Sequence, residues 1–402
     1  MRKYCYVGRS AVNSKLAFST YSLVEGAVKL TLPLGLDSTR GRSSIFYNSR
    51  MVLNRDISIL IARSLQSEVK GGLRICDPMT GSGVRGLRYA AEVDGVDRVL
   101  LSDIEPDAAA LSYYNAVSNN LDGRVDVQCM DANVFLSLHS VPGKRLHLID
   151  LDPYGSPVPF IDSAIRAILK SGVLAMTATD MAVLCGVKPH ACIRRYGGRP
   201  LRAEYSREVA LRLLAGALVT SAGRQGMAAE PVFAHSTDHY IRLYARIKRS
   251  ATEANRILQE MGYIHHCFRC LSRVVSRDQP KIRKCRRCGS VQTSQAGPLF
   301  LGRLTDKTLC SRLIRLQDPR SSGSGRLRRL LSLELEEADA PPTYYTVDTI
   351  CERVGTRTPS PVSVVEGLRA CGYTASRTHF TGGGFKTDAP VEAIINTVRE
   401  SV

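Results

Sequence analysis

The chain has 402 residues, enough for two domains that each bury a core. Hydrophobic residues make up 44% and charged residues 23%, which is ordinary for a globular protein and excludes a disordered or fibrous chain. Apolar stretches are short and the first residues lack the apolar run of a signal peptide, so we expect a cytoplasmic protein without a membrane span. Twelve cysteines in such a chain indicate metal ligands and buried thiols.

The charge is strongly basic and unevenly distributed. The formal net charge is +18, and 43 of the 55 basic residues are arginine, the side chain best suited to bidentate phosphate contacts. Residues 261–330 hold sixteen Lys and Arg against three acidic residues. Because solvated faces usually mix both signs, this basic block predicts binding of a polyanion.

Between residues 73 and 248, short apolar runs alternate with segments of helical periodicity. This alternation predicts an α/β fold with a doubly wound, mostly parallel sheet and ligand sites at the carboxyl ends of its strands. Expected helices cover residues 83–91 and 106–119, and another helix runs for roughly four turns from residue 202. The expected strands are residues 73–77, 98–102, 125–130, 146–151, 172–179, 231–235 and 239–247.

The pattern changes after residue 250. A basic, cysteine-rich insert at residues 265–289 precedes a stretch rich in Ser, Gly and Arg, residues 318–329, that we expect to be a loop or flexible joint. From residue 330 onward, helix-like segments alternate with turns, as in a small helical or winged-helix module.

A glycine-rich turn at residues 77–86 (DPMTGSGVRG) lies where a strand gives way to a helix, so the backbone can approach a ligand closely. The next two strands end near Asp103 and Asp131, whose carboxylates can accept hydrogen bonds from ribose hydroxyls and an adenine amino group. Three acidic strand ends facing one cleft favour a neutral or positively charged nucleoside such as S-adenosylmethionine. Each carboxylate alone could instead cap a helix.

The fourth strand runs into Asp152-Pro153-Tyr154, the arrangement of methyltransferases that act on exocyclic amino nitrogens. The amino lone pair is delocalised into the base, and a carboxylate that accepts the N–H bond localises it and can take the proton. An aromatic ring can stack on the extruded base. Asp150 lies on the same face of the strand and is the second candidate for this role. A strand-end turn with a core tyrosine is the structural alternative.

Two CxxC pairs separated by fourteen residues predict a structural zinc ribbon at residues 265–289, with the ligands Cys267, Cys270, Cys285 and Cys288. His265 and His266 lie beside the first pair and could compete as ligands, although four cysteines complete the shell. The basic residues around the second pair are expected to contact phosphates; they are Arg283, Lys284, Arg286 and Arg287.

Several motifs together resemble the archaeal-type tRNA (guanine(26)-N2)-dimethyltransferases, the N2,N2-dimethylguanosine tRNA methyltransferase family. The resemblance runs over nearly the whole chain. The matching segments are 46–48 (FYN), 54–56 (NRD), 83–86 (GVRG), 150–157 (DLDPYGSP), 177–180 (TATD), 184–186 (LCG), 376–380 (SRTHF) and 386–390 (KTDAP).

This resemblance implies transfer of one or two methyl groups from S-adenosylmethionine to N2 of guanosine 26 in tRNA, by a chain that we expect to be a monomer. It implies a Rossmann-like methyltransferase domain at residues 1–250 and a smaller α+β tRNA-binding domain with the zinc ribbon at residues 251–402. Asp152 would be the catalytic carboxylate, and Phe46 and Tyr154 would sandwich the guanine. The implied cofactor-binding residues are Arg55, Arg85, Asp103, Asp131 and Ala132.

The chain departs from the family at two positions: Tyr154 stands where the family usually has Phe, and Ser49 where it usually has Pro. Two alternatives are an amino-group methyltransferase acting on another substrate and a non-catalytic tRNA-binding protein of the same fold. The basic C-terminal half and the late motifs argue against the first. The intact Asp-Pro-Tyr motif and acidic strand ends argue against the second.

Overall fold

A computed structural model of the chain describes residues 5–6, 19–34, 45, 47–279, 283–319 and 323–401. The chain divides into two units, which are described separately. Unit 1 comprises residues 1–153, 159–176 and 315–327, and unit 2 comprises residues 154–158, 177–314 and 328–402. The sequence predicted a different kind of division, a cofactor-binding domain up to residue 250 and a tRNA-binding domain after it. That division stays a prediction.

A mostly parallel sheet forms the centre of unit 1. Its strands are β1 (Cys5–Tyr6), β4 (Leu73–Asp77), β5 (Val96–Asp103), β6 (Val125–Cys129), β7 (Leu146–Leu151) and β8 (Ile168–Ala178), whose last two residues belong to unit 2. They follow the order β1-β6-β5-β4-β7-β8, and only the short β1 among them pairs antiparallel. The register places Ile75 between Val99 and Leu148, all fully buried, as expected for a sheet covered on both faces.

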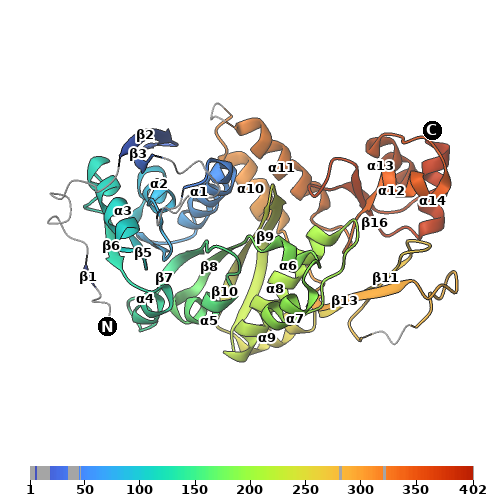
Figure 1. The fold of residues 1–402 in the computed structure, drawn as a ribbon, viewed down its shortest axis with the longest axis horizontal. Coiled ribbons are helices and arrows are strands. Elements are labelled where there is room, and N and C mark those ends of the chain that lie inside the picture. The colour runs from blue at the N-terminus through green and yellow to red at the C-terminus, as the bar shows by residue number, and fades with distance from the viewer. Residues whose placement is uncertain are drawn as a thin grey trace. The chain divides into compact units, whose positions relative to one another are not determined.

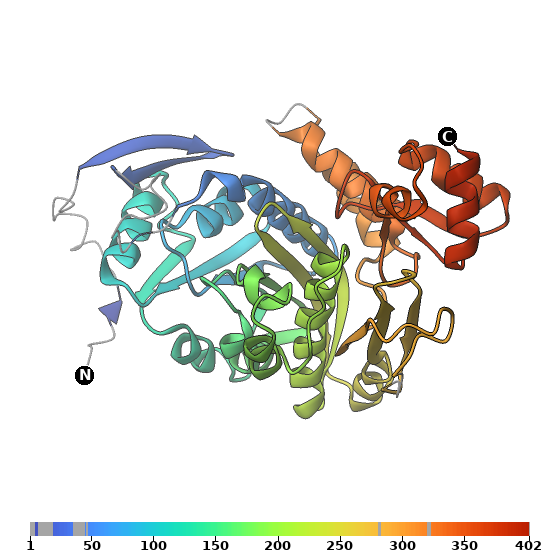
Figure 2. The same ribbon diagram turned by 45° about the vertical axis from the view of Figure 1, so that its right-hand side comes forward.

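Helices cover both faces of this sheet. They are α1 (Val52–Gln66), α2 (Val84–Glu92), α3 (Pro106–Ser118), α4 (Ala132–Leu138) and α5 (Val158–Ala167). Figures 1 and 2 show α1, α2 and α3 on one face, and α4 and α5 on the other. A hairpin of β2 (Thr20–Glu25) and β3 (Val28–Pro33) packs on α2 and α3, and a short helix, η2 (Ser49–Met51), precedes α1. The strand order reverses at β4, which defines a doubly wound, Rossmann-like fold.

Unit 2 is built around the helix α8 (Ser206–Arg224), which packs against an antiparallel pair of strands, β9 (Ala228–Thr237) and β10 (Tyr240–Lys248). Three antiparallel strands, β11 (Met261–Cys267), β12 (Arg273–Ser276) and β13 (Thr293–Phe300), carry the cysteine pairs. The remaining helices of this region are α6 (Met181–Leu184), α7 (Pro189–Tyr196), α9 (Ala251–Leu258), α10 (Lys307–Leu316) and α11 (Ser324–Glu337).

Residues 345–400 form a C-terminal module of helices around a small sheet. Its elements are β14 (Tyr345–Thr346), α12 (Val347–Val354), α13 (Pro361–Ala370), β15 (Ala375–Arg377), β16 (Gly384–Thr387) and α14 (Val391–Glu400), with the strand order β14-β16-β15. Two antiparallel strands follow the helix pair α12–α13, in line with the predicted winged-helix type of module.

The predicted α/β fold with a Rossmann-like sheet is confirmed. The expectation of a loop throughout residues 318–329 is wrong, because α11 begins at Ser324. Its leucines at positions 327, 330 and 331 are all buried, and such helical spacing of buried side chains outweighs the low helix propensity of Ser and Gly. None of the helices in the described part of the chain combines the length and apolar character needed to cross a membrane.

Candidate active site and metal site

Acidic residues lie where the parallel strands of unit 1 end. Asp77 and Asp103 are the last residues of β4 and β5, Asp131 follows β6, and Asp152 comes directly after β7. The backbone N–H of Met130 donates to the carbonyl of Asp103 at 2.9 Å, which joins the ends of β5 and β6. The sheet therefore brings the predicted carboxylates to one edge, where doubly wound proteins bind ligands.

The glycine-rich turn packs tightly beside Asp103. The Asp103 carboxylate accepts two backbone N–H groups: Oδ2 accepts that of Gly81 at 2.8 Å, and Oδ1 accepts that of Glu105 at 3.0 Å. Gly83 caps α2 with a φ of 85°, and a Cβ there would lie 3.1 Å from the Ser112 hydroxyl oxygen, so this position requires glycine. Burial raises the pKa of Asp103, although these N–H groups oppose the shift.

Asp131 is the N-cap of α4, where its Oδ1 accepts the backbone N–H groups of Asn133 at 2.9 Å and Val134 at 3.2 Å. The capping alternative is thus realised at this position. Both bonds use one carboxylate oxygen, so the other can act as an acceptor for a ligand. Ala132 is the first residue of the helix and is buried.

Arg85 lies on the first turn of α2 and is almost fully buried. Its guanidinium pairs with the carboxylate of Asp152 and donates to Asn54 Oδ1 at 2.8 Å and to Ser58 Oγ at 2.9 Å. Burial alone would lower the pKa of Arg85, but the negative charges of Asp150 and Asp152 outweigh this effect and raise the pKa above its usual value. The guanidinium therefore stays charged. Cofactor contact by Arg85, implied by the resemblance, stays a prediction.

The two candidate carboxylates of β7 differ in their surroundings. Asp150 has no exposed side-chain area, accepts the Tyr89 hydroxyl at 2.7 Å and lies 3.5 Å from Arg85. The side chain of Asp152 is 19% exposed. Among the two, Asp152 is therefore the carboxylate that a substrate can reach.

Arg55 lies on α1, is buried and pairs with a carboxylate of the β2–β3 hairpin. Its guanidinium forms a bidentate ion pair with Glu25, both bonds 2.6 Å long, and donates to the carbonyl of Asn48 at 3.1 Å. Glu25 also accepts the Tyr47 hydroxyl at 3.0 Å. Cofactor binding by Arg55 stays a prediction, and Phe46 lies outside the described residues.

Tyr154 is 76% exposed at the start of unit 2, on the turn that follows Asp152 and Pro153 in the sequence. A core position for this ring, the structural alternative raised by the sequence, is wrong. An exposed aromatic face on a strand-end turn can stack on a base.

Asp77 is the first of the three acidic strand ends that the sequence singled out, and the structure adds the environment of its carboxyl group. It is buried, and burial raises its pKa to about 8; Arg85 opposes the shift, whereas Asp150 and Asp152 add to it. The position of Asp77 at a strand end, directly before the glycine turn, could be seen in the sequence. That its carboxyl group is neutral follows only from its burial and its charged neighbours in the structure.

The four predicted cysteine ligands form one cluster in unit 2. The Sγ atoms of Cys267 and Cys288 are 3.7 Å apart, and those of Cys270 and Cys285 are 3.6 Å apart. Tetrahedral zinc with Zn–S bonds of about 2.3 Å requires S–S separations of about 3.8 Å, so the cluster fits zinc.

Each of the two cysteine pairs lies on a turn of the same backbone conformation, called a knuckle below. In the first pair, Leu271 N–H donates to the carbonyl of Cys267 at 2.9 Å, with Leu271 at a φ of 62°. In the second pair, Gly289 N–H donates to the carbonyl of Cys285 at 2.9 Å, with Gly289 at a φ of 69°. His265 and His266, the possible competitors, do not belong to the cluster.

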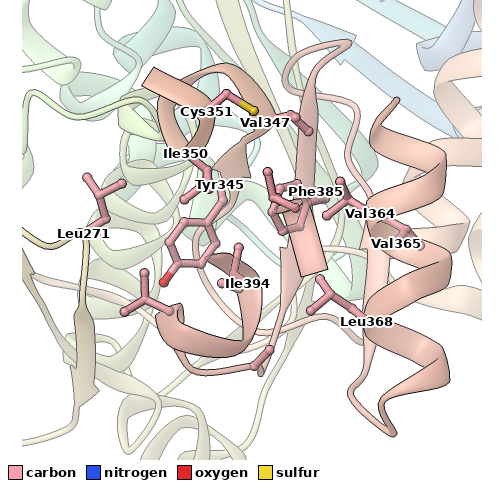
Figure 3. Packing of buried hydrophobic residues seen from close by; sticks show 13 residues of the cluster. Leu271, Tyr345, Val347, Ile350, Cys351, Val364, Val365, Leu368, Phe385 and Ile394 are labelled. Carbon is pink, nitrogen blue, oxygen red and sulfur yellow. The ribbon is translucent and has the colours of Figure 1, made fainter. Parts of the chain in front are cut away.

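The ribbon is part of the core of the C-terminal module. Leu271 belongs to a buried cluster with Tyr345, Phe385 and Ile394, and Figure 3 shows its side chain beside these residues. Arg273 donates to the carbonyl of Tyr344 at 2.6 Å and stacks over the Tyr345 ring at 3.6 Å. The ribbon and the module are therefore packed as one body within unit 2.

Arg287 differs from the other basic residues around the second knuckle. It forms an ion pair with Glu392 of α14, so its guanidinium already has an anionic partner. The predicted phosphate contacts therefore rest mainly on Arg283, Lys284 and Arg286.

A second group of possible metal ligands, Glu334, Glu337 and His379, is better described as a buried hydrogen-bonded network. Ser236 N–H lies 3.1 Å from Nε2 of His379 and requires a lone pair there. The ring proton must then be on Nδ1, which faces the two carboxylates at 2.9 and 2.5 Å. Lys386 lies 3.4 Å from Glu337. The late motifs thus contribute to the stability of unit 2.

The fold and the carboxyl edge define a class, the Rossmann-like methyltransferases with an Asp-Pro-aromatic turn. Within that class, the chain belongs to the N2,N2-dimethylguanosine tRNA methyltransferase family, whose sequence profile matches residues 26–399. The match spans both units.

Individual relatives agree with this assignment. The chain is 36% identical to the tRNA (guanine(26)-N(2))-dimethyltransferase of Methanothermobacter thermautotrophicus, over 92% of this chain and 96% of the relative. It is 32% identical to the tRNA (guanine(26)-N(2)/guanine(27)-N(2))-dimethyltransferase of Aquifex aeolicus, over 94% and 95%. The complex of Trm1 from Pyrococcus horikoshii with S-adenosyl-L-methionine has a TM-score of 0.82 and 31% identity, covering 94% of this chain and 99% of that one.

Proposed function

We propose that the protein is an S-adenosylmethionine-dependent tRNA methyltransferase that adds one or two methyl groups to N2 of guanosine 26. The observation that carries this proposal is Asp152, an accessible carboxylate held by buried Arg85 at the carboxyl edge of a parallel sheet. The names of the relatives and the S-adenosylmethionine complex of the Pyrococcus protein support it.

The carboxyl edge of unit 1 fits a positively charged nucleoside cofactor. A Cβ at Gly83 would press against Ser112, so the glycine turn stays tight, and the carboxylate of Asp103 accepts the N–H of Gly81 in the same turn. Asp103, Asp131 and Ala132 would hold the nucleoside, with Arg55 and Arg85 as further contacts. When bound, S-adenosylmethionine supplies a methyl carbon activated by a sulfonium charge.

Asp152 provides the chemistry that a guanine amino group needs. Its carboxylate accepts an N2–H bond, directs the nitrogen lone pair toward the methyl carbon and takes the proton as the C–N bond forms. Because Asp152 is 19% exposed, it can release this proton to water before a second transfer. The Tyr154 ring would stack on one face of the extruded guanine, and Phe46 on the other.

The experiment is methylation of tRNA transcripts with labelled S-adenosylmethionine, followed by digestion to nucleosides and sequencing of the modified position. We expect N2-methylguanosine and N2,N2-dimethylguanosine at position 26. A transcript with adenosine at position 26 should contain neither of these nucleosides. Position 27 is read in the same assay because the Aquifex relative is named for both positions. Equal methylation of both transcripts at other positions would refute the assignment to guanosine 26.

We also propose that Cys267, Cys270, Cys285 and Cys288 bind one structural Zn²⁺, and that residues 251–402 supply the main tRNA contacts. The sulfur separations and the repeated knuckle support the metal. Four thiolates close the coordination shell, so this site has a structural role and takes no part in methyl transfer. The basic block at residues 261–330 supports the tRNA contacts. Cytoplasmic location and a monomeric state stay predictions.

A further inference from the structure

The turn that carries Tyr154 is fixed by a pair of hydrogen bonds to one residue of another segment. The backbone N–H of Gly155 donates to Thr179 Oγ1 at 2.7 Å, and the backbone N–H of Thr179 donates to the carbonyl of Gly155 at 2.9 Å. Gly155 has a φ of 83°, so the turn adopts a left-handed conformation at this residue. Both polar backbone groups of Gly155 are thereby held by Thr179.

The residue after Thr179 fixes the turn at a second point. Asp180 accepts the Tyr196 hydroxyl at 2.6 Å and pairs with Arg195 at 3.0 Å. The Tyr196 ring is buried, and its hydroxyl also hydrogen-bonds Ser156, the residue after Gly155. Thr179 therefore holds Gly155 directly and Asp180 acts on Ser156 only through the Tyr196 hydroxyl, while the adjacent Tyr154 ring stays 76% exposed.

We infer that Thr179 is a positioning residue for base binding, which holds the exposed Tyr154 ring in a stacking orientation through its two hydrogen bonds to Gly155. Holding a ring in its bound orientation before the base arrives reduces the entropy lost on binding. The backbone of the turn sets where the Cα–Cβ bond of Tyr154 points, so the two hydrogen bonds to the next residue, Gly155, help to set the position of the ring. The inference rests on the proposed stacking role of Tyr154.

The variants Thr179→Val and Thr179→Ser separate the hydroxyl from the rest of the side chain. Valine nearly preserves the shape but leaves the Gly155 N–H without its acceptor, whereas serine keeps the acceptor. We expect Thr179→Val to lower kcat on tRNA by about tenfold, the equivalent of losing one hydrogen bond. The dissociation constant for S-adenosylmethionine should stay within about twofold, and Thr179→Ser should restore turnover.

A double-mutant cycle tests whether Thr179 acts through Tyr154. In a Tyr154→Ala background, Thr179→Val should cause little further loss of turnover. An equal loss in both backgrounds would show that Thr179 has only a structural role and would overturn the inference. If Tyr154→Ala itself leaves turnover unchanged, the proposed stacking role fails instead.

A second measurement does not depend on activity. The chain contains no tryptophan, so Tyr154→Trp places a unique fluorophore on the turn. Its time-resolved anisotropy should show faster local motion when Thr179→Val is added, and unchanged motion with Thr179→Ser. Identical anisotropy decays in all three proteins would contradict the positioning role even if methylation of tRNA is confirmed.

Discussion

The guanidinium of Arg85 pairs directly with the carboxylate of Asp152 and lies 3.5 Å from Oδ2 of Asp150. The resemblance assigns Arg85 to the cofactor and Asp152 to catalysis, yet in the structure the two side chains form one ion pair. A substitution of Arg85 would therefore disturb both predicted roles together. Changes at its partners are more informative, because each leaves the guanidinium in place.

We predict that Asp77 is protonated in the folded protein near neutral pH. Burial raises its pKa to about 8, whereas an unfolded aspartate titrates near pH 4. The folded state then keeps a proton that the unfolded chain has released, so this group's contribution to stability falls as the pH rises from about 4 toward about 8. Asp77→Asn imitates the neutral acid and should flatten that part of the profile. Urea unfolding at about pH 5 and about pH 8 measures this, and an unchanged pH dependence would contradict it.

Glu25→Gln should destabilise unit 1 strongly. The carboxylate of Glu25 is buried and pairs with the buried guanidinium groups of Arg55 and Arg88, at 2.6 and 3.0 Å. Removing its charge leaves cationic groups without full compensation, which costs about 3–5 kcal/mol. Tyr47→Phe, the matched control, deletes only one hydrogen bond to the same carboxylate and should cost about 1 kcal/mol. Denaturant unfolding that gives equal values for both variants would exclude this account of Glu25.

Replacing Cys285 and Cys288 with serine should remove the metal and also loosen the C-terminal module. Elemental analysis should find one zinc per wild-type chain and none in the variant. Because Leu271 of the first knuckle packs in the core of the module, hydrogen exchange should increase in α12 and α14 as well as in the ribbon. Leu271→Ala should give the same increase in α12 and α14 while retaining zinc. Protection that is lost only in residues 265–289 would show that the two parts fold separately.

The basic residues of the second knuckle should differ in how much each contributes to tRNA binding. Replacing Arg283, Lys284 and Arg286 with alanine should weaken tRNA binding and reduce the slope of log affinity against log salt by up to about one unit per lost phosphate contact. Arg287→Ala breaks the ion pair with Glu392 and should change that slope less. Filter binding over a range of salt concentrations measures both. An equal change of slope per residue for Arg287 would show that it leaves Glu392 to bind phosphate.

The sequence was sufficient for the sheet, the glycine turn and the cysteine cluster, because each depends on local pattern and spacing. The alternation of apolar strands with helices predicted a mostly parallel sheet, and such a sheet brings Asp103, Asp131 and Asp152 to one edge. The CxxC spacing predicted a cluster whose sulfur separations fit a tetrahedral metal.

Pairings between distant residues could not be read from the sequence. Glu25 and Arg55 are 30 positions apart, and Thr179 and Gly155 are 24 positions apart. No periodicity links such residues, and only the folded backbone brings them together. The helix of residues 324–337 was missed for a similar reason, since its buried leucines are stabilised by packing and its first residues are poor helix formers.

The most direct test of the account is the single-turnover rate of Asp152→Asn on a tRNA transcript with guanosine at position 26. An amide accepts a hydrogen bond but cannot take the proton, so we expect the rate to fall by about a hundredfold or more while S-adenosylmethionine still binds. Tyr89→Phe, which removes a hydrogen bond from buried Asp150, should leave the rate within about tenfold of the wild type. A near-normal rate for Asp152→Asn would contradict the assignment of Asp152 as the catalytic carboxylate.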